Sequence, residues 1–289
     1  MDKRLIIVAG PTASGKTQHA IELAQKYDTE IVSCDSRQIY SELCIGVARP
    51  TIEQLSIVKH HFVACRSVEM PYNVFDFEHD AIELIGHLFC HHDTVIAVGG
   101  SGLYIDAIIN GIAVMPDPTP ELRNQLKDLL NRQGIAALQS MLQEIDPDYY
   151  AVVDKSNPIR LQRAIEVSIT AGRPYSKLIA EHTIKKRPFD IEVVVMNVEP
   201  SALRERINHR VDEMIDSGLY EEVCSLWHLQ HLNTLNTVGY REFFAYGTPH
   251  QAASAISSIT EAIKLNTWHY AKKQMTWCKK RYSQRENQF

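Results

Sequence analysis

The chain has 289 residues, a net charge of −5 and a hydrophobic fraction of 45%, an ordinary composition for a globular protein with room for one large core and an insertion. No apolar run approaches the roughly 20 residues that span a bilayer, and residues 1–4 lead directly into an apolar segment, so we expect a cytoplasmic protein with no membrane partner. The 6 cysteines include no C-x-x-C pair, which argues against a zinc site and a disulfide framework.

The first predicted elements flank a phosphate-binding pattern. Residues 5–9 predict a buried strand, and residues 16–27 carry apolar side chains at helical spacing. Between them every fixed position of G-x-x-x-x-G-K-[ST] is occupied, in the loop Gly10, Pro11, Thr12, Ala13, Ser14, Gly15, Lys16 and Thr17. Such a loop turns its N–H groups and a lysine toward an anion and offers the Thr17 hydroxyl to magnesium. The pattern is typical of nucleotide-binding, including ATP-binding, proteins, but it does not specify the phosphate.

Two further strands are expected to end beside this loop. Residues 30–33 form a short apolar strand before Asp35, and residues 94–98 form a buried strand before Gly99-Gly100-Ser101. The carboxyl ends of parallel strands line the ligand crevice, so Asp35 can accept a proton there or simply cap the following turn. The two glycines at the end of the second strand, Gly99 and Gly100, suggest backbone that approaches a ligand, to which the Ser101 hydroxyl is presented, with a plain turn as the alternative.

The intervening segments carry weaker signals. Residues 45–51 predict an extended segment, residues 60–64 another short strand, and residues 75–90 a helix. His87 and His91 stand four apart on that helix, but no third ligand or H-E-x-x-H pattern accompanies them, so we expect surface histidines.

The alternation of strands and helices stops at three prolines in residues 116–120. Helices are predicted at 121–132, 135–144 and 157–171, and strand character returns at 191–196. We therefore expect a core of residues 1–116 and 190–289 and a helical insertion of residues 117–189. Arg160 and Arg163 share one face of the third helix, where they can hold phosphates or bases, or form a solvated face with Glu166.

The carboxyl-terminal part is basic. The predicted helix 201–216 places Arg206 and Arg210 on one face, either as a diphosphate clamp or as a salt-bridge surface with Glu205 and Asp212. Residues 256–285 predict two helices or one bent helix. From residue 264 to the end there are seven Lys or Arg against one Glu, interleaved with aromatic side chains. This composition suits a single-stranded or loop RNA, although a solvated terminal helix has similar charge.

Together these pieces resemble one family, the tRNA dimethylallyltransferases, or tRNA isopentenyltransferases. The resemblance is carried by the phosphate loop, D-S-R-Q at 35–38, His60-His61, V-G-G-S-G-L-Y at 98–104, N-x-x-R-x-x-R-A-x-E at 157–166, V-G-Y-R-E at 238–242 and A-K-K-Q-x-T-W at 271–277. They follow the family's order along nearly the whole chain. The phosphate loop alone is shared by many enzyme classes, whereas the combination is specific.

The resemblance implies a P-loop NTPase-like parallel α/β sheet flanked by helices, with an all-helical insertion domain that contacts tRNA. It implies transfer of a dimethylallyl group from dimethylallyl diphosphate to N6 of the adenine on the 3′ side of a tRNA anticodon, with Mg²⁺ and release of pyrophosphate. The phosphate loop with Arg210 would hold the diphosphate, Thr17 the metal, and Asp35 and Ser101 would be catalytic. The implied tRNA contacts are Asp35, Ser36, Arg37, Gln38, Ser101, Arg123, Ile159, Arg160, Leu161, Gln162, Arg163, Lys272 and Lys273. A monomer is expected.

Three departures from the family pattern are visible. Ser101 stands where the family usually has threonine, Trp268-His269 displaces an arginine, and Val47-Ala48 replaces a Thr-Ala pair. Two other functions remain open from the residues. A P-loop kinase of a nucleotide or small metabolite explains the loop but not the basic tail, and a non-catalytic RNA-binding module explains the tail but leaves Asp35 without a role.

Overall fold

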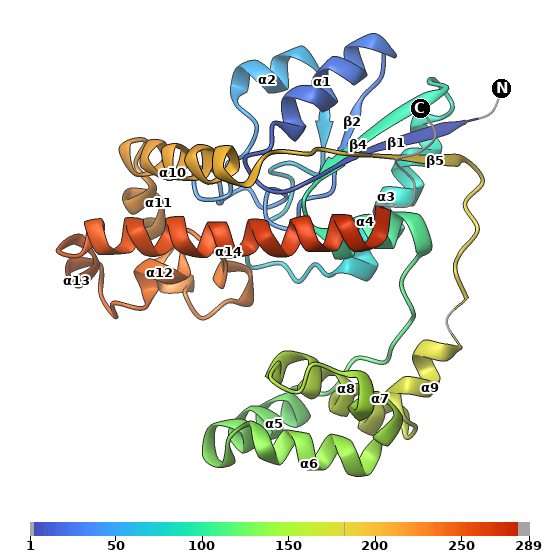
Figure 1. Ribbon diagram of the computed structural model, residues 1–289, viewed down its shortest axis with the longest axis vertical. Helices are drawn as coiled ribbons and strands as arrows, with labels where there is room; N and C mark the ends of the chain where they lie inside the picture. Colours follow the sequence, from blue (N-terminus) through green and yellow to red (C-terminus); the bar gives the residue numbers. More distant parts are fainter. Residues whose placement is uncertain (1–2, 182, 283–289) are drawn as a thin grey trace. The chain divides into compact units, whose positions relative to one another are not determined.

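The computed structural model describes residues 3–181 and 183–282, and the predicted helical residues 283–285 lie outside this part of the chain. The chain divides into two compact units. One consists of residues 1–109 and 186–289, and the other of residues 110–185. Figure 1 follows the chain through both.

The first unit is built on a parallel sheet. In the described residues it has five strands in the order β3-β2-β4-β1-β5, and every neighbouring pair is parallel. The register sets Ala9 of β1 beside Gly99 of β4 and Val195 of β5. Because the strands are parallel, the segments that follow β1, β2 and β4 emerge at the same edge of the sheet, the one formed by the carboxyl ends of the strands. The strands are β1 (Arg4–Ala9), β2 (Ile31–Ser33), β3 (His60–His61), β4 (Thr94–Gly99) and β5 (Asp190–Val195).

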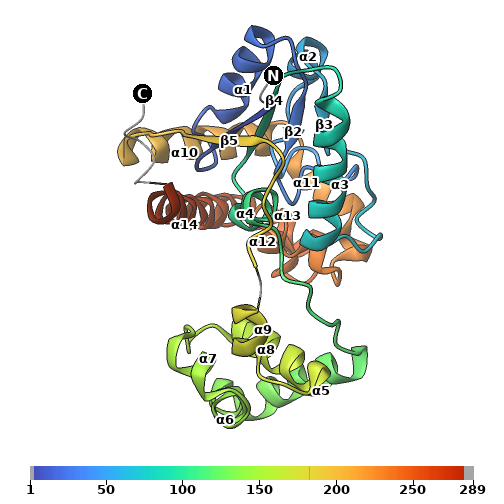
Figure 2. The ribbon, with the colours of Figure 1, turned by 90° about the vertical axis from the view of Figure 1, so that its right-hand side faces the viewer.

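Both faces of the sheet are covered, because side chains in a strand alternate between faces. Ile6 and Val8 of β1 pack against α1 (Lys16–Lys26), while Leu5 and Ile7 pack against α3 (Val74–Leu88) and α4 (Gly102–Asn110). Figures 1 and 2 show α1 on one side of the sheet and α4 on the other. This burial on both sides explains why β1 and β4 are continuous apolar runs in the sequence.

A second core in this unit joins the carboxyl-terminal helices. Leu203 and Ile207 of α10 pack with Ile259 and Ile263 of α14 in one buried cluster. Helix α14 is a single helix rather than two, and its buried face continues through Cys278, which packs against the sheet. The elements concerned are α10 (Pro200–Asp216), α11 (Leu219–Ser225), α12 (Arg241–Phe244), α13 (Pro249–Ala253), α14 (Ile256–Tyr282) and the 3₁₀ helices Trp227–Leu229 and Asn233–Leu235.

Two predictions for the connecting segments were wrong. The predicted strand 60–64 ends after His61, because Phe62 and Ala64 adopt φ values of 57° and 50° that a strand cannot accommodate. The predicted extended segment 45–51 is a series of turns, in which Ala48 has a φ of 46°. It is followed by α2 (Ile52–Ile57), a short helix begun by a capping box at Thr51.

The carboxylate of Glu222, on α11, explains the conformation of those turns. It accepts hydrogen bonds from the backbone N–H groups of Cys44 (3.1 Å), Ile45 (2.9 Å) and Gly46 (3.1 Å). The Tyr240 hydroxyl donates a further hydrogen bond of 2.5 Å to Glu222. One carboxylate thus gathers three successive N–H groups, a pattern that periodicity in the sequence does not reveal.

The second unit is entirely helical in its described residues. Its core includes Leu126, Leu138, Leu142, Leu161 and Ile165. The predicted helices 121–132, 135–144 and 157–171 are confirmed, and two six-residue helices were missed because they are too short for periodicity to reveal. The unit contains α5 (Pro120–Gln133), α6 (Ile135–Ile145), α7 (Pro147–Val152), α8 (Pro158–Ala171) and α9 (Tyr175–Ala180).

Candidate active site

The phosphate loop has the geometry of an anion cradle. It joins β1 to α1, with Ala13 and Gly15 in left-handed conformations (φ 61° and 88°) that turn the chain tightly. Gly15 is the N-cap of α1, and no side chain caps that end of the helix. The first N–H groups of α1 are therefore directed toward an incoming anion. The hydroxyl of Ser14 is buried in this loop without a hydrogen-bond partner among the described residues.

Two cations flank the loop. The Lys16 ammonium donates a hydrogen bond of 2.5 Å to the Pro11 carbonyl. Arg210, from α10, donates to the Thr12 hydroxyl (3.1 Å) and to the Ala48 carbonyl (3.3 Å). Burial lowers the pKa of Lys16 to about 8, although the negative charge of Asp35 opposes this shift. Burial also lowers the pKa of Arg210, again against the charge of Asp35, but a guanidinium remains charged at neutral pH.

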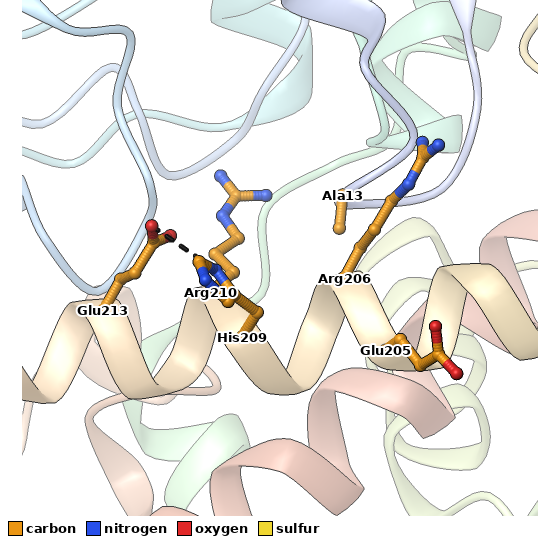
Figure 3. A pocket seen from close by; sticks show the side chains of 6 residues that line it. All are labelled: Ala13, Glu205, Arg206, His209, Arg210 and Glu213. Carbon is orange, nitrogen blue, oxygen red and sulfur yellow. Dashed lines mark ion pairs between the residues drawn. The ribbon is translucent and has the colours of Figure 1, made fainter.

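An open groove of about 600 Å³ runs along α10 beside the loop (Figure 3). Its lining residues are Ala13, Glu205, Arg206, His209, Arg210 and Glu213. His209 is paired with Glu213 at 3.4 Å, whereas Arg206 extends from α10 alongside Ala13 of the phosphate loop. Asp212, which the sequence offered as a partner for Arg206 and Arg210, is paired with Lys264 at 2.7 Å. The groove is open to solvent and reaches Ala13 of the phosphate loop.

Asp35 lies at the carboxyl end of β2, at the same edge of the sheet. Its Oδ1 accepts hydrogen bonds from the backbone N–H groups of Arg37 (2.8 Å) and Gln38 (3.3 Å). Asp35 therefore caps the turn that follows through Oδ1, which confirms one of the two interpretations offered by the sequence. A carboxylate has a second oxygen atom, Oδ2, and its role as a proton acceptor stays a prediction.

Ser101, in the loop after β4, is hydrogen-bonded to the segment of residues 35–38. Its hydroxyl accepts a hydrogen bond from the Ser36 N–H (3.1 Å) and donates one to the Ser36 hydroxyl (3.3 Å). Gln38 turns instead toward the segment that replaces the family's Thr-Ala, where its amide donates to the carbonyls of Val47 (3.2 Å) and Ala48 (2.9 Å). Gln38, like Asp35, Ser36 and Ser101, therefore has protein partners in this structure.

The glycines around Ser101 lie against other parts of the protein. A Cβ on Gly99 would lie 2.4 Å from the Cys34 carbonyl oxygen, and one on Gly102 would lie 2.6 Å from the ring of Trp277. Close packing therefore requires glycine at both positions, and the approach of a ligand to this backbone stays a prediction.

Helix α14 contributes two site residues that the sequence analysis missed. Gln274 is only 7% exposed and bonds to both the phosphate loop and the loop after β4. Tyr270, one turn earlier, interacts through its hydroxyl with Ser101 and Gln274, and enclosure of that hydroxyl raises the pKa of Tyr270 to about 12. A glutamine on the apolar face of the helix, between Ala271 and Cys278, was the available signal. Lys272 and Lys273 occupy the exposed face.

The predicted tRNA-binding residues of the second unit form a separate group. Arg123 on α5 and Arg163 on α8 both act on Glu166, whose pKa is raised by burial against their positive charges. Ile159 is 73% exposed and Arg160 is also exposed, in the first turn of α8 after the Asn157 N-cap. Gln162 is half-buried. Leu161 is fully buried in the core of the unit, which removes its side chain from any surface.

Among the described residues, no group of three or more His, Cys, Asp or Glu side chains is arranged to hold a metal ion. His87 is exposed and lies 3.8 Å from Glu83. Nor does any helix of residues 3–181 and 183–282 have the length and apolar character needed to cross a membrane.

The parallel sheet, the phosphate loop before the uncapped start of α1 and the nearby carboxylate of Asp35 define a P-loop-like α/β enzyme. A model of the IPP transferase family matches residues 38–281. The chain is 43% identical to tRNA dimethylallyltransferase 2 of Azobacteroides pseudotrichonymphae over 278 residues, which are 96% of this chain and 89% of that protein. The chain therefore belongs to the tRNA dimethylallyltransferase (IPP transferase) family and is a prenyltransferase, which confirms the family resemblance and the fold class predicted from its sequence.

Solved structures agree with this assignment. The crystal structure of the full-length tRNA isopentenylpyrophosphate transferase from Bacillus halodurans has a TM-score of 0.66 and 29% identity, with 95% of this chain and 86% of that chain covered. A eukaryotic dimethylallyltransferase described as acting on tRNA has a TM-score of 0.77 and 25% identity, over 96% of this chain and 70% of that chain.

Proposed function

We propose that this chain transfers a dimethylallyl group from dimethylallyl diphosphate to N6 of the adenine on the 3′ side of a tRNA anticodon. One observation carries the proposal: the edge of the sheet brings an anion cradle with two cations, Lys16 and Arg210, next to the acidic side chain of Asp35. A departing diphosphate needs the first feature and a nucleophile that loses a proton needs the second. The relatives named above supply the chemistry of the two substrates.

In the proposed reaction the allylic C–O bond breaks and a C–N bond forms to the exocyclic nitrogen. The electron pair of the broken bond leaves with the diphosphate, whose growing charge is met by the N–H groups at the start of α1, by Lys16 and by Arg210. The nitrogen gives up one proton, for which Oδ2 of Asp35 is the acceptor. Two backbone N–H groups hold Oδ1 and thereby fix the direction of Oδ2.

The phosphate loop also offers ligands that fit magnesium. Mg²⁺ prefers oxygen ligands and is usually held by one or two protein groups together with substrate phosphates. Thr17 is the second residue of α1 and is half-buried, and the Ser14 hydroxyl in the same loop is buried without a partner in the described part of the chain. Thr17 would hold the ion, which when bound neutralises charge on the diphosphate.

The tRNA contacts in this proposal follow the family resemblance. On the first unit they are Asp35, Ser36, Arg37, Gln38, Ser101, Lys272 and Lys273, and on the second Arg123, Ile159, Arg160, Gln162 and Arg163. Leu161 can take part only through its backbone, because its side chain is buried. The target adenine has to leave its stack to reach the edge of the sheet, at a cost of a few kcal/mol that is smallest in a loop. A cytoplasmic location and a monomeric state remain predictions.

The proposal is tested with purified protein, unmodified tRNA, Mg²⁺ and dimethylallyl diphosphate. Digestion to nucleosides and mass spectrometry should reveal one adenosine heavier by a dimethylallyl group. ATP in place of the allylic donor should give no group transfer. Transfer of the γ-phosphate of ATP to a small acceptor, without prenylation of tRNA, would refute the proposal in favour of a kinase.

A further inference from the structure

Gln274 connects the two loops that hold the opposite ends of the proposed reaction. Its Oε1 accepts a hydrogen bond of 2.9 Å from the Thr12 N–H of the phosphate loop. Its Nε2 donates one of 2.9 Å to the Gly100 carbonyl, next to Ser101. The orientation of the amide is fixed by these partners, since an N–H faces the oxygen and a carbonyl faces the nitrogen.

The backbone is adapted to this contact. A Cβ at position 100 would lie 2.3 Å from Nε2 of Gln274, so only glycine lets the amide come this close. Gln274 is 7% exposed and lies on the buried face of α14, where a polar side chain without partners would be costly.

The same contact reaches further into the site on both sides. Thr12, whose N–H bonds to Gln274, receives the Arg210 guanidinium on its hydroxyl. Tyr270 interacts with both Gln274 and Ser101 through its hydroxyl. Gln274 is thus linked through Thr12 to Arg210, the cation proposed to face the diphosphate, and through Tyr270 to Ser101, the serine beside the proposed proton acceptor.

We propose that Gln274 is a positioning residue that sets the distance between the diphosphate cradle and the Asp35–Ser101 side of the site. This inference rests on the proposed prenyl transfer. The allylic carbon has to meet the adenine nitrogen while the diphosphate remains in its cradle, so the two loops must keep their separation. A displacement of about 1 Å can cost on the order of 10²-fold in rate.

The first test replaces the amide by an apolar group of similar length, Gln274→Met. Since both loops lose their link, kcat at saturating substrates should fall by about 10- to 100-fold. KM for tRNA should stay within about threefold, because the tRNA-facing side chains are retained. A kcat within threefold of the wild type would overturn the inference.

The matched control is Asn266→Leu on the same helix. Asn266 donates a hydrogen bond of 2.8 Å to Glu242 and touches neither loop. The Asn266→Leu substitution removes a partly buried polar contact comparable to those of Gln274. It should therefore lower thermal stability while kcat per folded molecule stays unchanged. Equal losses of kcat in both variants would show that any weakening of α14 has the same effect, and would also overturn the inference.

Gln274→Glu adds a test whose expected result, a pH-dependent rate, would not be seen if Gln274 only stabilised the fold. A protonated carboxyl can accept from Thr12 and donate to Gly100 as the amide does, whereas a carboxylate has no proton for the Gly100 carbonyl. Burial should raise the pKa of the new carboxyl. The ratio of kcat for this variant to kcat for the wild type should therefore rise as the pH is lowered from about 8 to 6.

Division by the wild-type rate removes the pH dependence that comes from the ionisable groups around the site, which are Lys16, Asp35, Arg37, Arg210, Tyr270 and Cys278. The corresponding ratio for Gln274→Met should be flat, and a flat ratio for Gln274→Glu overturns the inference. Absence of prenyl transfer by the wild type would instead overturn the proposed function, and the inference with it.

Discussion

Replacement of Asp35 by asparagine separates the two tasks that the structure gives this side chain. Asparagine keeps a carbonyl oxygen in the place of Oδ1, so the hydrogen bonds from Arg37 (2.8 Å) and Gln38 (3.3 Å) can persist. The position of Oδ2 becomes an NH₂ group, which cannot accept the proton from the adenine amine. The turn should remain folded while the proposed base is lost.

The expected loss follows from the size of general base catalysis. A positioned base contributes about 10²- to 10⁴-fold, or about 2.7 to 5.4 kcal/mol of transition-state stabilisation. We expect Asp35→Asn to lower the single-turnover rate of prenyl transfer by that factor. Its affinity for tRNA should change by less than about threefold, because loss of one negative charge leaves the basic surface of α14 intact.

Lys16 supplies the necessary control. Its pKa of about 8 is lowered by burial and supported by the charge of Asp35, so the Asp35→Asn variant should have a still lower Lys16 pKa. At pH 8 part of the lost rate would then come from a neutral Lys16. That part should return as the pH is lowered toward 6.5, while the part due to the missing base should not.

The assay is single-turnover prenylation with excess enzyme, quenched and measured by mass spectrometry at pH 6.5 and 8, with tRNA affinity and melting temperature measured in parallel. A folded variant that prenylates tRNA within threefold of the wild type at both pH values would refute Asp35 as the base. Full recovery at pH 6.5 alone would assign the effect to Lys16.

Three further outcomes are expected. The affinity for inorganic pyrophosphate, measured by titration calorimetry between pH 7 and 9.5, should fall as the pH rises above the Lys16 pKa of about 8, because only the ammonium form attracts the anion. In the Lys16→Arg variant this affinity should depend less on pH, because a guanidinium stays charged over that range. Gly102→Ala should lower the free energy of unfolding by about 1–3 kcal/mol in urea titrations, because the new methyl meets the Trp277 ring at 2.6 Å, and an unchanged midpoint would contradict this packing. Tyr240→Phe should cost about 1.5–3 kcal/mol by removing its hydrogen bond to Glu222, which the same titration measures.

Local sequence was sufficient for the phosphate loop and the sheet. The loop conformation depends on glycines a few residues apart and on the helix that follows, so neighbouring residues determine it. The strands at 5–9 and 94–98 were recognisable because a strand covered by helices on both faces must be apolar along its length. Asp35 and Ser101 could be placed together because both follow parallel strands.

Local signals were misleading where distant groups fix the backbone. The residues at 45–51 have no strong preference of their own, and Glu222 collects their N–H groups from more than 170 positions away. Leu161 fits a tRNA-contacting motif in the sequence, yet it belongs to the core of the helical unit. Motif position does not reveal which side of a helix faces the core.

The sequence by itself determined the family, the phosphate cradle and the proposed proton acceptor, because each depends on short spacings and on the order of the strands. Only the tertiary structure revealed Gln274 as the link between the two loops, and the reason for glycine at positions 99, 100 and 102. Gln274 and Thr12 are 262 positions apart, and their contact exists only because α14 packs against the carboxyl edge of the sheet. Close packing between distant segments leaves no periodic trace in either of them.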